Sequence, residues 1–220
     1  HGDVNGDGKG DMLASPYLEF YSSPPASSTV KMYSGSNGAV IWSKTLTGAY
    51  MGALGHELVN LPPVGDMNGD GKPDVVLTSW PTGLSAGKVS FKAVAKNGVN
   101  GATLWQKTSG MDIPIPTGVT WTDIGWRHAS SYAYNMGDLN GDGRDDTAIG
   151  TYFQFDSSTN WGSRSKTFVV NGNGGGTMFS FYSRTHESYV SWHFIFNAGN
   201  VAGTSQPDVL VYTLIGYYMY

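Results

Sequence analysis

The chain has 220 residues, no cysteine and a formal net charge of −4, and these values bound the classes of protein to which it can belong. The absence of cysteine excludes a disulfide-stapled scaffold, and the acidic balance argues against a nucleic-acid surface or a polybasic membrane anchor. No apolar run reaches the roughly eighteen residues that span a bilayer. With 31 glycines, 13% aromatic and only 14% charged residues, the composition favours a turn-rich all-β fold. We therefore expect neither a nucleic-acid partner nor a membrane span.

A repeated motif divides the chain. The sequence GDVNGDGKGDML at residues 2–13 returns as GDMNGDGKPDVVL at 65–77 and as GDLNGDGRDDTAI at 137–149, and a decayed fourth copy, GNVAGTSQPDVLV, occupies 199–211. The first positions of the motif, Asp3, Asp66, Asp138 and Asn200, are separated by 63, 72 and 62 residues. This period fits four short strands with their turns, and it predicts one β-propeller blade per repeat.

Strand patterns recur in the same order after each motif. An apolar run comes first, a second run follows a polar loop, and an Asn-Gly turn then leads into an aromatic-bearing strand. These runs lie at residues 12–14, 29–33 and 39–45, at 75–78, 88–95 and 102–107, and at 147–151, 166–170 and 177–182, with turns at Asn37-Gly38, at Asn97-Gly98, and at Asn171-Gly172 or Asn173-Gly174. The equivalent residues Trp42, Trp105 and Phe179 are predicted to form blade-to-blade core.

The predicted fold is a single β-propeller segment of four-stranded antiparallel blades. We expect a partial first blade at residues 1–50, full blades at 51–110 and 111–185, and a partial fourth blade at 186–220. This tally gives thirteen strands, in groups of three, four, four and two, or about three and a half blades. Fewer than four blades leave sheet edges open. We therefore expect either part of a larger propeller or one that another chain completes by β-addition. The chain opens at His1 without an initiator methionine or signal peptide, from which we expect a processed or excised segment.

The nine residues at the centre of each motif form a candidate cation loop. Side-chain oxygens recur at positions one, three, five and nine, a backbone carbonyl is available at position seven, and hard oxygen ligands at this density suit Ca²⁺ better than Mg²⁺. The predicted ligands are Asp3, Asn5, Asp7, Asp11 and the carbonyl of Lys9; Asp66, Asn68, Asp70, Asp74 and the carbonyl of Lys72; and Asp138, Asn140, Asp142, Asp146 and the carbonyl of Arg144. Any single copy is also compatible with a metal-free Asp/Asn/Gly turn, but crowded carboxylates without a cation are costly.

Two comparisons limit this interpretation. An EF-hand loop begins in the same way but needs an acidic residue at position twelve and flanking helices. Position twelve is Ala14, Leu77 or Ile149 here, each inside a strand-like run. In the fourth loop, residues 200–208, Asn200, Ala202 and Thr204 replace the ligands and leave Asp208 alone, so we expect three Ca²⁺ sites and an empty fourth loop.

At this point the chain resembles the FG-GAP or VCBS-type repeats of integrin α-subunit heads and related secreted proteins. The matching stretches are GDMNGDGKPDVVLTSW and VKMYSGSNGAVIWSKTLTG, and the likeness covers nearly the whole chain. The resemblance implies a propeller, usually of seven or eight blades, with calcium in its hairpin loops and a role in adhesion, carbohydrate binding or scaffolding. The chain departs from the family at Gly55-His56-Glu57 and Trp126-Arg127-His128, which stand where Phe-Gly is expected.

Other candidate residues are weaker. His56 and His128 each precede their loop by ten residues, and this repetition favours a structural role. Four residues offer an acid/base set like that of calcium-loop polysaccharide lyases, but without diagnostic spacing: Glu57, Asp123, Arg127 and His186. Six aromatic residues in expected loops or at their margins offer sugar-stacking surfaces: Tyr17, Tyr21, Trp80, Trp121, Trp126 and Trp161.

These observations together predict a non-enzymatic, calcium-binding extracellular or cell-surface module that binds a carbohydrate or protein ligand or acts as a scaffold. Such loops need millimolar calcium, which favours the extracellular location, and we expect no catalytic residue and no organic cofactor. An alternative is a subunit of an extracellular filament or surface layer, assembled from copies of the chain through exposed strand edges. A third interpretation is a fragment of a polysaccharide lyase.

Overall fold

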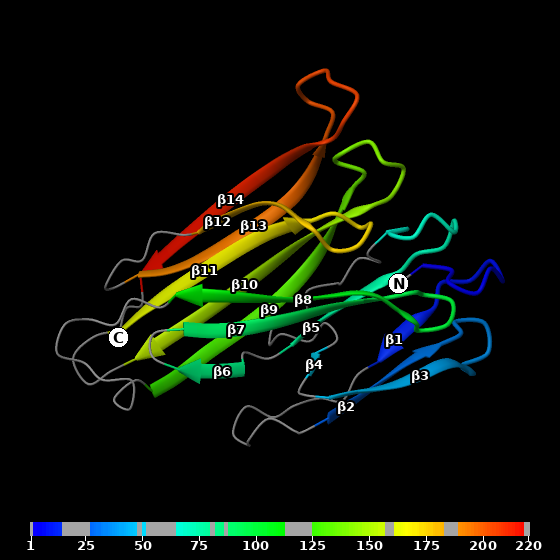
Figure 1. Ribbon diagram of the computed structural model, residues 1–220, viewed down its shortest axis with the longest axis horizontal. Coiled ribbons are helices and arrows are strands. Elements are labelled where there is room, and N and C mark those ends of the chain that lie inside the picture. Colours follow the sequence, from blue (N-terminus) through cyan, green and yellow to red (C-terminus); the bar gives the residue numbers. More distant parts are fainter. Residues whose placement is uncertain are drawn as a thin grey trace.

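Fourteen strands in four antiparallel sheets make up the computed structural model, which describes residues 2–14, 27–47, 50–51, 65–79, 82–85, 88–112, 125–156, 161–182 and 189–217 (Figure 1). None of these residues is helical, so the predicted all-β class is confirmed. The sheets follow one another along the chain, as the blades of a partial propeller do.

The first sheet has the order β1-β2-β3 and contains β1 (Met12–Ala14), β2 (Ser27–Tyr33) and β3 (Val40–Thr47). The second contains β4 (Tyr50–Met51), β5 (Val75–Ser79), β6 (Thr82–Ser85), β7 (Lys88–Lys96) and β8 (Thr103–Asp112), in the order β4-β5-β7-β6 with β8 also paired to β7. The third has the order β12-β11-β10-β9 and contains β9 (Gly125–Gly137), β10 (Asp146–Asp156), β11 (Trp161–Val170) and β12 (Thr177–Tyr182). The fourth pairs β13 (Tyr189–Gly199) with β14 (Asp208–Tyr217).

The predicted tally of thirteen strands is one short because one blade strand is interrupted. β5 pairs with the C-terminal half of β7 (Val75 opposite Lys96), and β6 pairs with its N-terminal end (Ser85 opposite Lys88). β8 runs along the whole of β7, so β5 and β6 share its other side and occupy the place of one strand. In the third sheet the equivalent strand, β10, is continuous. The second sheet is therefore a four-position blade, as predicted.

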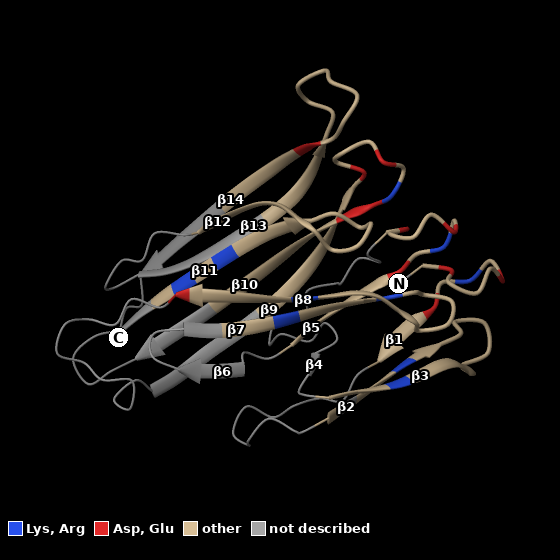
Figure 2. Ribbon diagram, in the orientation of Figure 1, with Lys and Arg blue, Asp and Glu red and all other residues tan. Residues whose placement is uncertain are grey.

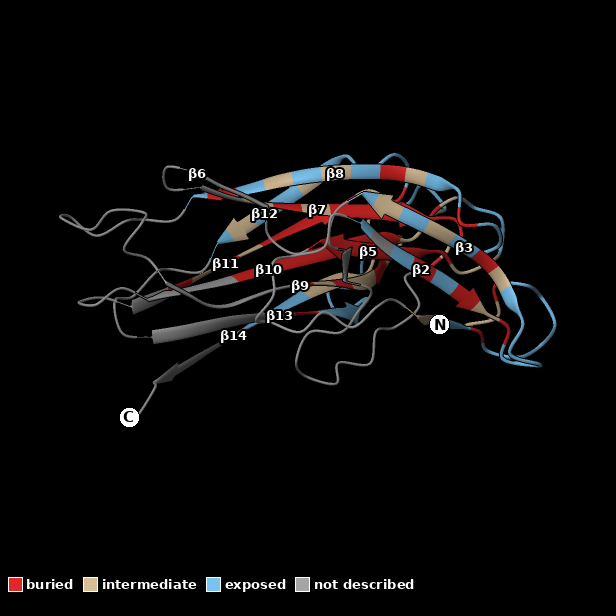
Figure 3. Cartoon of the chain, turned by 90° about the horizontal axis from the view of Figure 1, so that it is seen from below, coloured by how far each residue is buried: buried red, intermediate tan, exposed pale blue. Residues whose placement is uncertain are grey.

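The sheets stack face to face because their central strands carry apolar side chains on both faces. Within β5, Val75 and Leu77 pack toward the first sheet while Val76 packs toward the third, as the alternation of side chains along a strand requires. The same alternation in β10 sends Ile149 toward the second sheet and Ala148 toward the fourth. Figure 3 shows the result, with buried residues along β5, β7 and β10 and exposed residues along much of β3 and β8. The second and third sheets are therefore each packed against both of their neighbours.

Two of the three predicted core aromatics lie between blades. Trp42 is buried and donates its indole N–H to the backbone oxygen of Gly98 in the next sheet at 2.6 Å. Trp105 is also buried, against the third sheet. Phe179, by contrast, is 43% exposed. The prediction for Phe179 is wrong because the described part of the fourth sheet has only two strands, so no third strand covers this ring.

The hairpin turns occur where they are predicted but are longer than two-residue Asn-Gly turns. Backbone bonds close them between residues 34 and 39, 97 and 102, and 171 and 176. The left-handed residue near the end of each turn is Gly38 (φ 72), Gly101 (φ 69) or Gly175 (φ 71). Asn97-Gly98 and Asn171-Gly172 therefore open their turns and are equivalent to Ser34-Gly35, not to Asn37-Gly38.

The second residue of each turn must be glycine because the turn packs closely against other backbone. A Cβ on Gly35, Gly98 or Gly172 would overlap a backbone oxygen of the loop, that of Gly10, Pro73 or Asp145 respectively. Each hairpin turn therefore lies directly against the nine-residue loop of its own sheet, and only glycine permits this approach.

Replacement of Gly172 by alanine is expected to lower the free energy of unfolding by about 2–3 kcal/mol, because the added methyl group meets backbone that cannot rotate away. Gly176→Ala is the matched control in the same turn, since its Cβ would meet no atom within 4 Å. Urea unfolding of both variants makes the comparison. Equal destabilisation of the two would contradict the close packing of turn and loop.

Candidate metal centre

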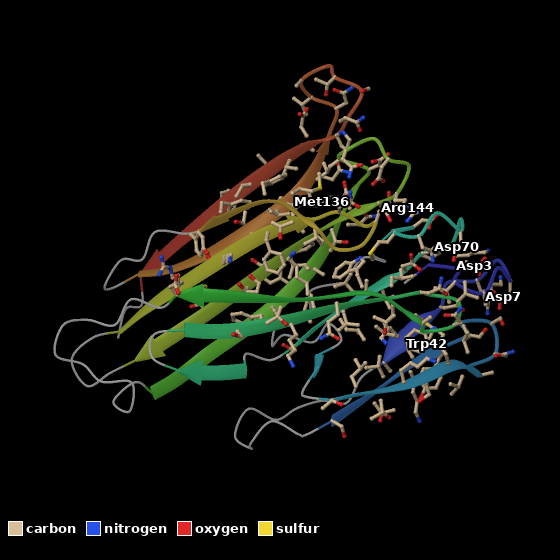
Figure 4. The ribbon with its side chains drawn as sticks, viewed as in Figure 1. Asp3, Asp7, Trp42, Asp70, Met136 and Arg144 are labelled. Carbon is tan, nitrogen blue, oxygen red and sulfur yellow. The ribbon has the colours of Figure 1, made fainter. Side chains whose placement is uncertain are left out.

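The nine-residue loops lie in a row at one end of the sheets. Figure 2 shows acidic residues gathered on this row and also at the end of β8, while lysine and arginine lie on the row and along β3, β7 and β11. Figure 4 shows Asp3, Asp7 and Asp70 near one another on the first two loops and Arg144 on the next. The structure therefore brings the three predicted cation loops to the same edge of the stack.

The aspartate at position one organises each loop around its own carboxylate. In the first loop, Asp3 Oδ1 accepts the backbone N–H groups of Gly6 and Asp7 at 2.6 and 3.0 Å, and Oδ2 accepts that of Gly8 at 2.9 Å. Asp66 and Asp138 accept the same three N–H groups in their loops, at 2.7–3.0 Å. The three loops thus share one backbone conformation, turned inward on the first carboxylate.

The aspartate at position five joins the loop to the hairpin turn. Asp70 Oδ2 accepts the amide N–H of Asn97 at 2.9 Å, and Asp142 Oδ2 accepts that of Asn171 at 3.1 Å. In the first loop, the hydroxyl of Ser34 takes the place of these amides at 3.2 Å from Asp7 Oδ2. A second hydroxyl, from Ser36, lies at 2.8 Å and is the main cause of the lowered pKa of Asp7.

The position-three asparagine lies between these two carboxylates. Its Oδ1 accepts the N–H of the position-five residue at 2.8–2.9 Å in each loop. In the first two loops its Nδ2 donates to the position-five carboxylate, from Asn5 to Asp7 at 3.1 Å and from Asn68 to Asp70 at 2.9 Å. Positions one, three and five therefore present their oxygens around one small turn.

The aspartate at position nine is a buried clamp. In the second loop, Asp74 Oδ2 accepts the N–H of Met67 at 3.0 Å and Oδ1 accepts that of Gly98 at 3.0 Å. Asp11 and Asp146 make the equivalent pairs of bonds at 2.8–3.0 Å. All three carboxylates are almost inaccessible, with exposures of 3%, 0% and 0% for Asp11, Asp74 and Asp146. Each carboxylate therefore binds the start of its loop to the hairpin turn.

Burial of these clamps has an electrostatic cost. Desolvation raises the pKa of Asp74 to about 6 although two backbone N–H groups oppose the shift, and the charges of Asp70 and Asp66 raise it further. Desolvation likewise raises the pKa of Asp146, with Asp142 and Asp138 adding to the effect. Carboxylates in the same loop therefore repel one another when no cation is present.

The position-seven residue reaches over the preceding loop with its side chain. A Cβ placed on Gly6 would lie 2.7 Å from Lys72 Nζ, and one on Gly69 would lie 3.8 Å from Arg144 Nε. Gln206 takes the same place over Gly141, at 2.5 Å. The predicted ligand carbonyls of Lys72 and Arg144 thus belong to residues whose side chains pack on the neighbouring blade.

The fourth loop keeps only half of the clamp, because the bonds to its position-nine aspartate come from the start of the loop alone. Asp208 Oδ2 accepts the N–H groups of Val201 and Ala202, both at 2.7 Å. Asp208 is only partly buried, unlike Asp11, Asp74 and Asp146, and Ala202 and Thr204 supply no carboxylate. The fourth loop therefore keeps a bond that shapes the loop although it has lost most of the oxygen donors for a cation.

The donor set of the first three loops fits a hard divalent cation. Within the described part of the chain, no group of three or more histidine, aspartate or glutamate side chains is gathered for metal binding. Each loop instead offers two carboxylates and an asparagine carbonyl at positions one, three and five, all oxygen donors of the kind that calcium prefers. A carboxylate has about four lone-pair sites, and Asp3, Asp66, Asp70 and Asp138 each accept three hydrogen bonds, which leaves acceptor capacity for an ion. Asp7 already accepts four, so an ion in the first loop would have to replace one of them.

Sequence reasoning missed the residues outside the loops that hold them in place. These are the turn residues Ser34, Ser36, Asn97 and Asn171 and the glycines that follow three of them. Alignment of Ser34-Gly35 with Asn97-Gly98 and Asn171-Gly172 would have revealed them, because each pair lies at nearly the same distance from the last aspartate of its loop.

Several other candidates cannot be placed. His56, Glu57, Asp123 and His186 lie outside the described residues, as do Tyr17, Tyr21, Trp80 and Trp121. Trp126, Arg127, His128 and Trp161 lie in described strands, but their side chains are outside the description.

Comparison with protein-family models, with curated proteins and with solved structures gave no match for this chain. Among the residues that the structure describes, no helix has the length and apolar character needed to cross a membrane.

Asp74→Ala is expected to lower the free energy of unfolding by about 2 kcal/mol or more, because it leaves two buried N–H groups without an acceptor. Asp208→Ala removes the equivalent clamp in an exposed loop, where water replaces the carboxylate, and should cost no more than about 0.5 kcal/mol. Denaturant unfolding at neutral pH in a chelator isolates this effect from any bound ion. A smaller loss for Asp74→Ala than for Asp208→Ala would contradict the clamp.

Proposed function

We propose that this protein is a calcium-binding extracellular β-propeller module, related to the FG-GAP or VCBS-type repeats, that binds a protein or carbohydrate ligand or serves as a scaffold. The observation that carries the proposal is the threefold repetition of one loop geometry with one set of oxygen donors. Three loops that share their backbone bonds and their ligand types support a shared ligand.

Electrostatics supports a cation as that ligand. The three loops hold nine carboxylates at positions one, five and nine, in a chain whose net charge is only −4. The raised pKa of Asp74 and of Asp146 reflects the burial of charge close to other carboxylates. A divalent ion at positions one, three and five, with the position-seven carbonyl, would offset this repulsion. Three such ions would bring the formal charge to +2.

Calcium is favoured over magnesium by the ligand types. Asparagine and backbone carbonyl oxygens next to aspartates are frequent calcium ligands, and the flexible coordination of calcium tolerates a small turn that also satisfies its own N–H groups. Magnesium requires a near-ideal octahedron and retains its waters. Loops of this type in extracellular modules bind calcium with dissociation constants of about 10⁻⁴–10⁻³ M, which supports the extracellular or cell-surface location.

The distribution of the functional groups supports a binding or scaffolding role without catalysis. The carboxylates that the structure brings together are repeated in three equivalent loops, whereas a catalytic group is needed only once. The buried clamps among them are engaged by backbone N–H groups.

Calcium at 10 mM should raise the thermal midpoint by at least about 5 °C over the value in a chelator, because a ligand at 10–100 times its dissociation constant adds about 1.4–2.7 kcal/mol per site. The triple variant D7N/D70N/D142N should lose most of this shift, and equal ionic strength in NaCl is the solvent control. An unchanged midpoint with calcium and with chelator would refute the proposal.

Assembly of copies is a second candidate function, which the exposed face of the fourth sheet favours. The position-two residues Val4 and Met67 are 0% and 1% exposed, because the hairpin turn of the next sheet packs against each loop. The equivalent Val201 is 76% exposed. Beside it, Leu210 and Phe196 stand opposite each other across β13 and β14 and are 55% and 49% exposed. An apolar sheet face of this kind marks an interaction site.

The partner we favour for this face is a second copy of the chain. The first sheet has the same kind of hairpin turn that receives a neighbouring sheet at the other junctions. Gly101 of the second sheet receives Trp42 from the first, and the equivalent Gly38 has no atom within 4 Å of a Cβ position. The open turn at Gly38 thus leaves a surface of the first sheet on which the fourth sheet of a preceding molecule could stack.

Sedimentation velocity over a range of protein concentrations tests assembly. We expect concentration-dependent oligomers that Leu210→Asp abolishes and that Val99→Asp, a control at an exposed turn residue, leaves intact. A monomer at all concentrations would rule out assembly through this face.

A further inference from the structure

Two of the predicted cation loops are bonded directly to each other. Asp145, the eighth residue of the loop 138–146, donates its backbone N–H to the carbonyl of Asp66 at 2.9 Å, and its Oδ2 accepts the N–H of Asp66 at 2.9 Å. The amide of Asn135 at the end of β9 also donates to this Oδ2, at 3.3 Å. The peptide groups on both sides of Asp66, the first residue of its loop, are therefore held by one residue of the next loop.

The neighbouring junctions cannot make this pair of bonds. Position eight is Pro73 in the second loop and Pro207 in the fourth, and proline has neither a backbone N–H nor a carboxylate. The second and third loops are thus joined by contacts that the first and second loops, and the third and fourth loops, lack.

The backbone at the receiving end is adapted to Asp145. A Cβ on Gly65 would overlap the Asp145 carboxylate, so only glycine admits it. Gly65 has a φ of 30°, whereas Gly2, Gly137 and Gly199 at the equivalent position have values of 87°, 66° and 67°. The loop that receives Asp145 therefore begins in a different conformation from the other three.

We propose that Asp145 is a positioning residue that couples ion binding in the loop 66–74 to ion binding in the loop 138–146, while the loop 3–11 binds its ion independently. This inference rests on the proposed calcium-binding function and adds a relation between the sites.

The coupling follows from the position of Asp145 within its own loop. It lies between Arg144, whose carbonyl is a predicted ligand, and Asp146, the buried clamp. An ion that orders the backbone of residues 144–146 also orders the N–H and the carboxylate of Asp145, and these hold the main chain of Asp66. The second ion then meets a loop that is already ordered, which is a source of positive cooperativity. By linkage, an ion in the loop 66–74 must strengthen binding in the loop 138–146 by the same factor.

Calorimetric titration of the whole chain with calcium chloride can measure this factor. Asp7→Ala disables the loop 3–11 and leaves the two joined loops; adding Asp142→Ala or Asp70→Ala then leaves one of them alone. We expect the overall binding constant of the two joined loops to exceed the product of their single-loop constants by at least about fivefold, the lower end of typical coupling factors.

Substitution of Asp145 separates coupling from simple loss of structure. Asp145→Pro installs the residue that the second and fourth loops carry at this position, and it should reduce the factor to about one while each loop still binds an ion. Asp145→Asn keeps the N–H and an acceptor oxygen without the charge, and it should preserve the factor. A role in stability alone would weaken both loops and leave the factor unchanged.

The loops 3–11 and 66–74 form the internal control. With the loop 138–146 disabled by Asp142→Ala, their overall constant should equal the product of the single-loop constants, because Pro73 stands at their junction. If the loops 66–74 and 138–146 both bind calcium but their overall constant equals the product of the single-loop constants, the coupling is refuted and the proposed function stands. Absence of calcium binding in the unsubstituted chain would overturn both.

Discussion

The structure depends on a buried carboxylate that binds two backbone segments at once. Asp11, Asp74 and Asp146 each accept one N–H from the start of a loop and one from a hairpin turn. This pair of bonds fixes the loop against the turn so closely that the turn residue must be glycine. The turn joins β2 to β3, β7 to β8 or β11 to β12, and the loop leads into β1, β5 or β10, so the clamp sets the relative position of these three strands in each sheet. Two charge-assisted hydrogen bonds offset the free-energy cost of burying this charge. The other aspartates of the loop add electrostatic repulsion to that cost.

The clamp also prepares the surfaces through which blades stack. It places the position-two side chain, Val4 or Met67, where the turn of the next sheet covers it, and it leaves that turn open to Trp42 or Trp105. The nine-residue loop and the hairpin turn thus form the contact within a blade and also take part in the contact between blades. Each junction then varies in its details: Trp42 has an acceptor for its indole N–H, whereas Trp105 has no hydrogen-bond partner for its own among the described residues. Although the sequence repeats regularly, the junctions between blades therefore differ in their hydrogen bonds.

Sequence patterns predict what lies within one repeat and fail where neighbouring repeats meet. The loops, the strand order and the burial of Trp42 and Trp105 follow from periodicity, and the structure contains them. The exposure of Phe179 does not follow, since it depends on strands in the next sheet. The short strand β6 is invisible as well, because residues 82–85 lie in a stretch that is predicted as a polar loop. Asp145 gave no signal, since position eight lies outside the pattern of predicted ligands and its partner is a backbone group of another blade. The nature of any bound ion is likewise beyond the sequence, because oxygen donors of one type serve several cations.

The fourth loop shows that the clamp and the oxygen-donor set are separate properties. Asp208 still accepts the N–H groups that begin its loop, although Ala202 and Thr204 have replaced the donors at positions three and five. A nine-residue loop of this shape therefore does not need the other donors in order to form. In the first three loops, both oxygens of the position-nine carboxylate are already engaged by backbone N–H groups, while the position-one, position-three and position-five oxygens surround a turn near the surface. The buried position-nine carboxylate thus maintains the shape of the loop, and the oxygens at positions one, three and five are the groups that could bind a cation.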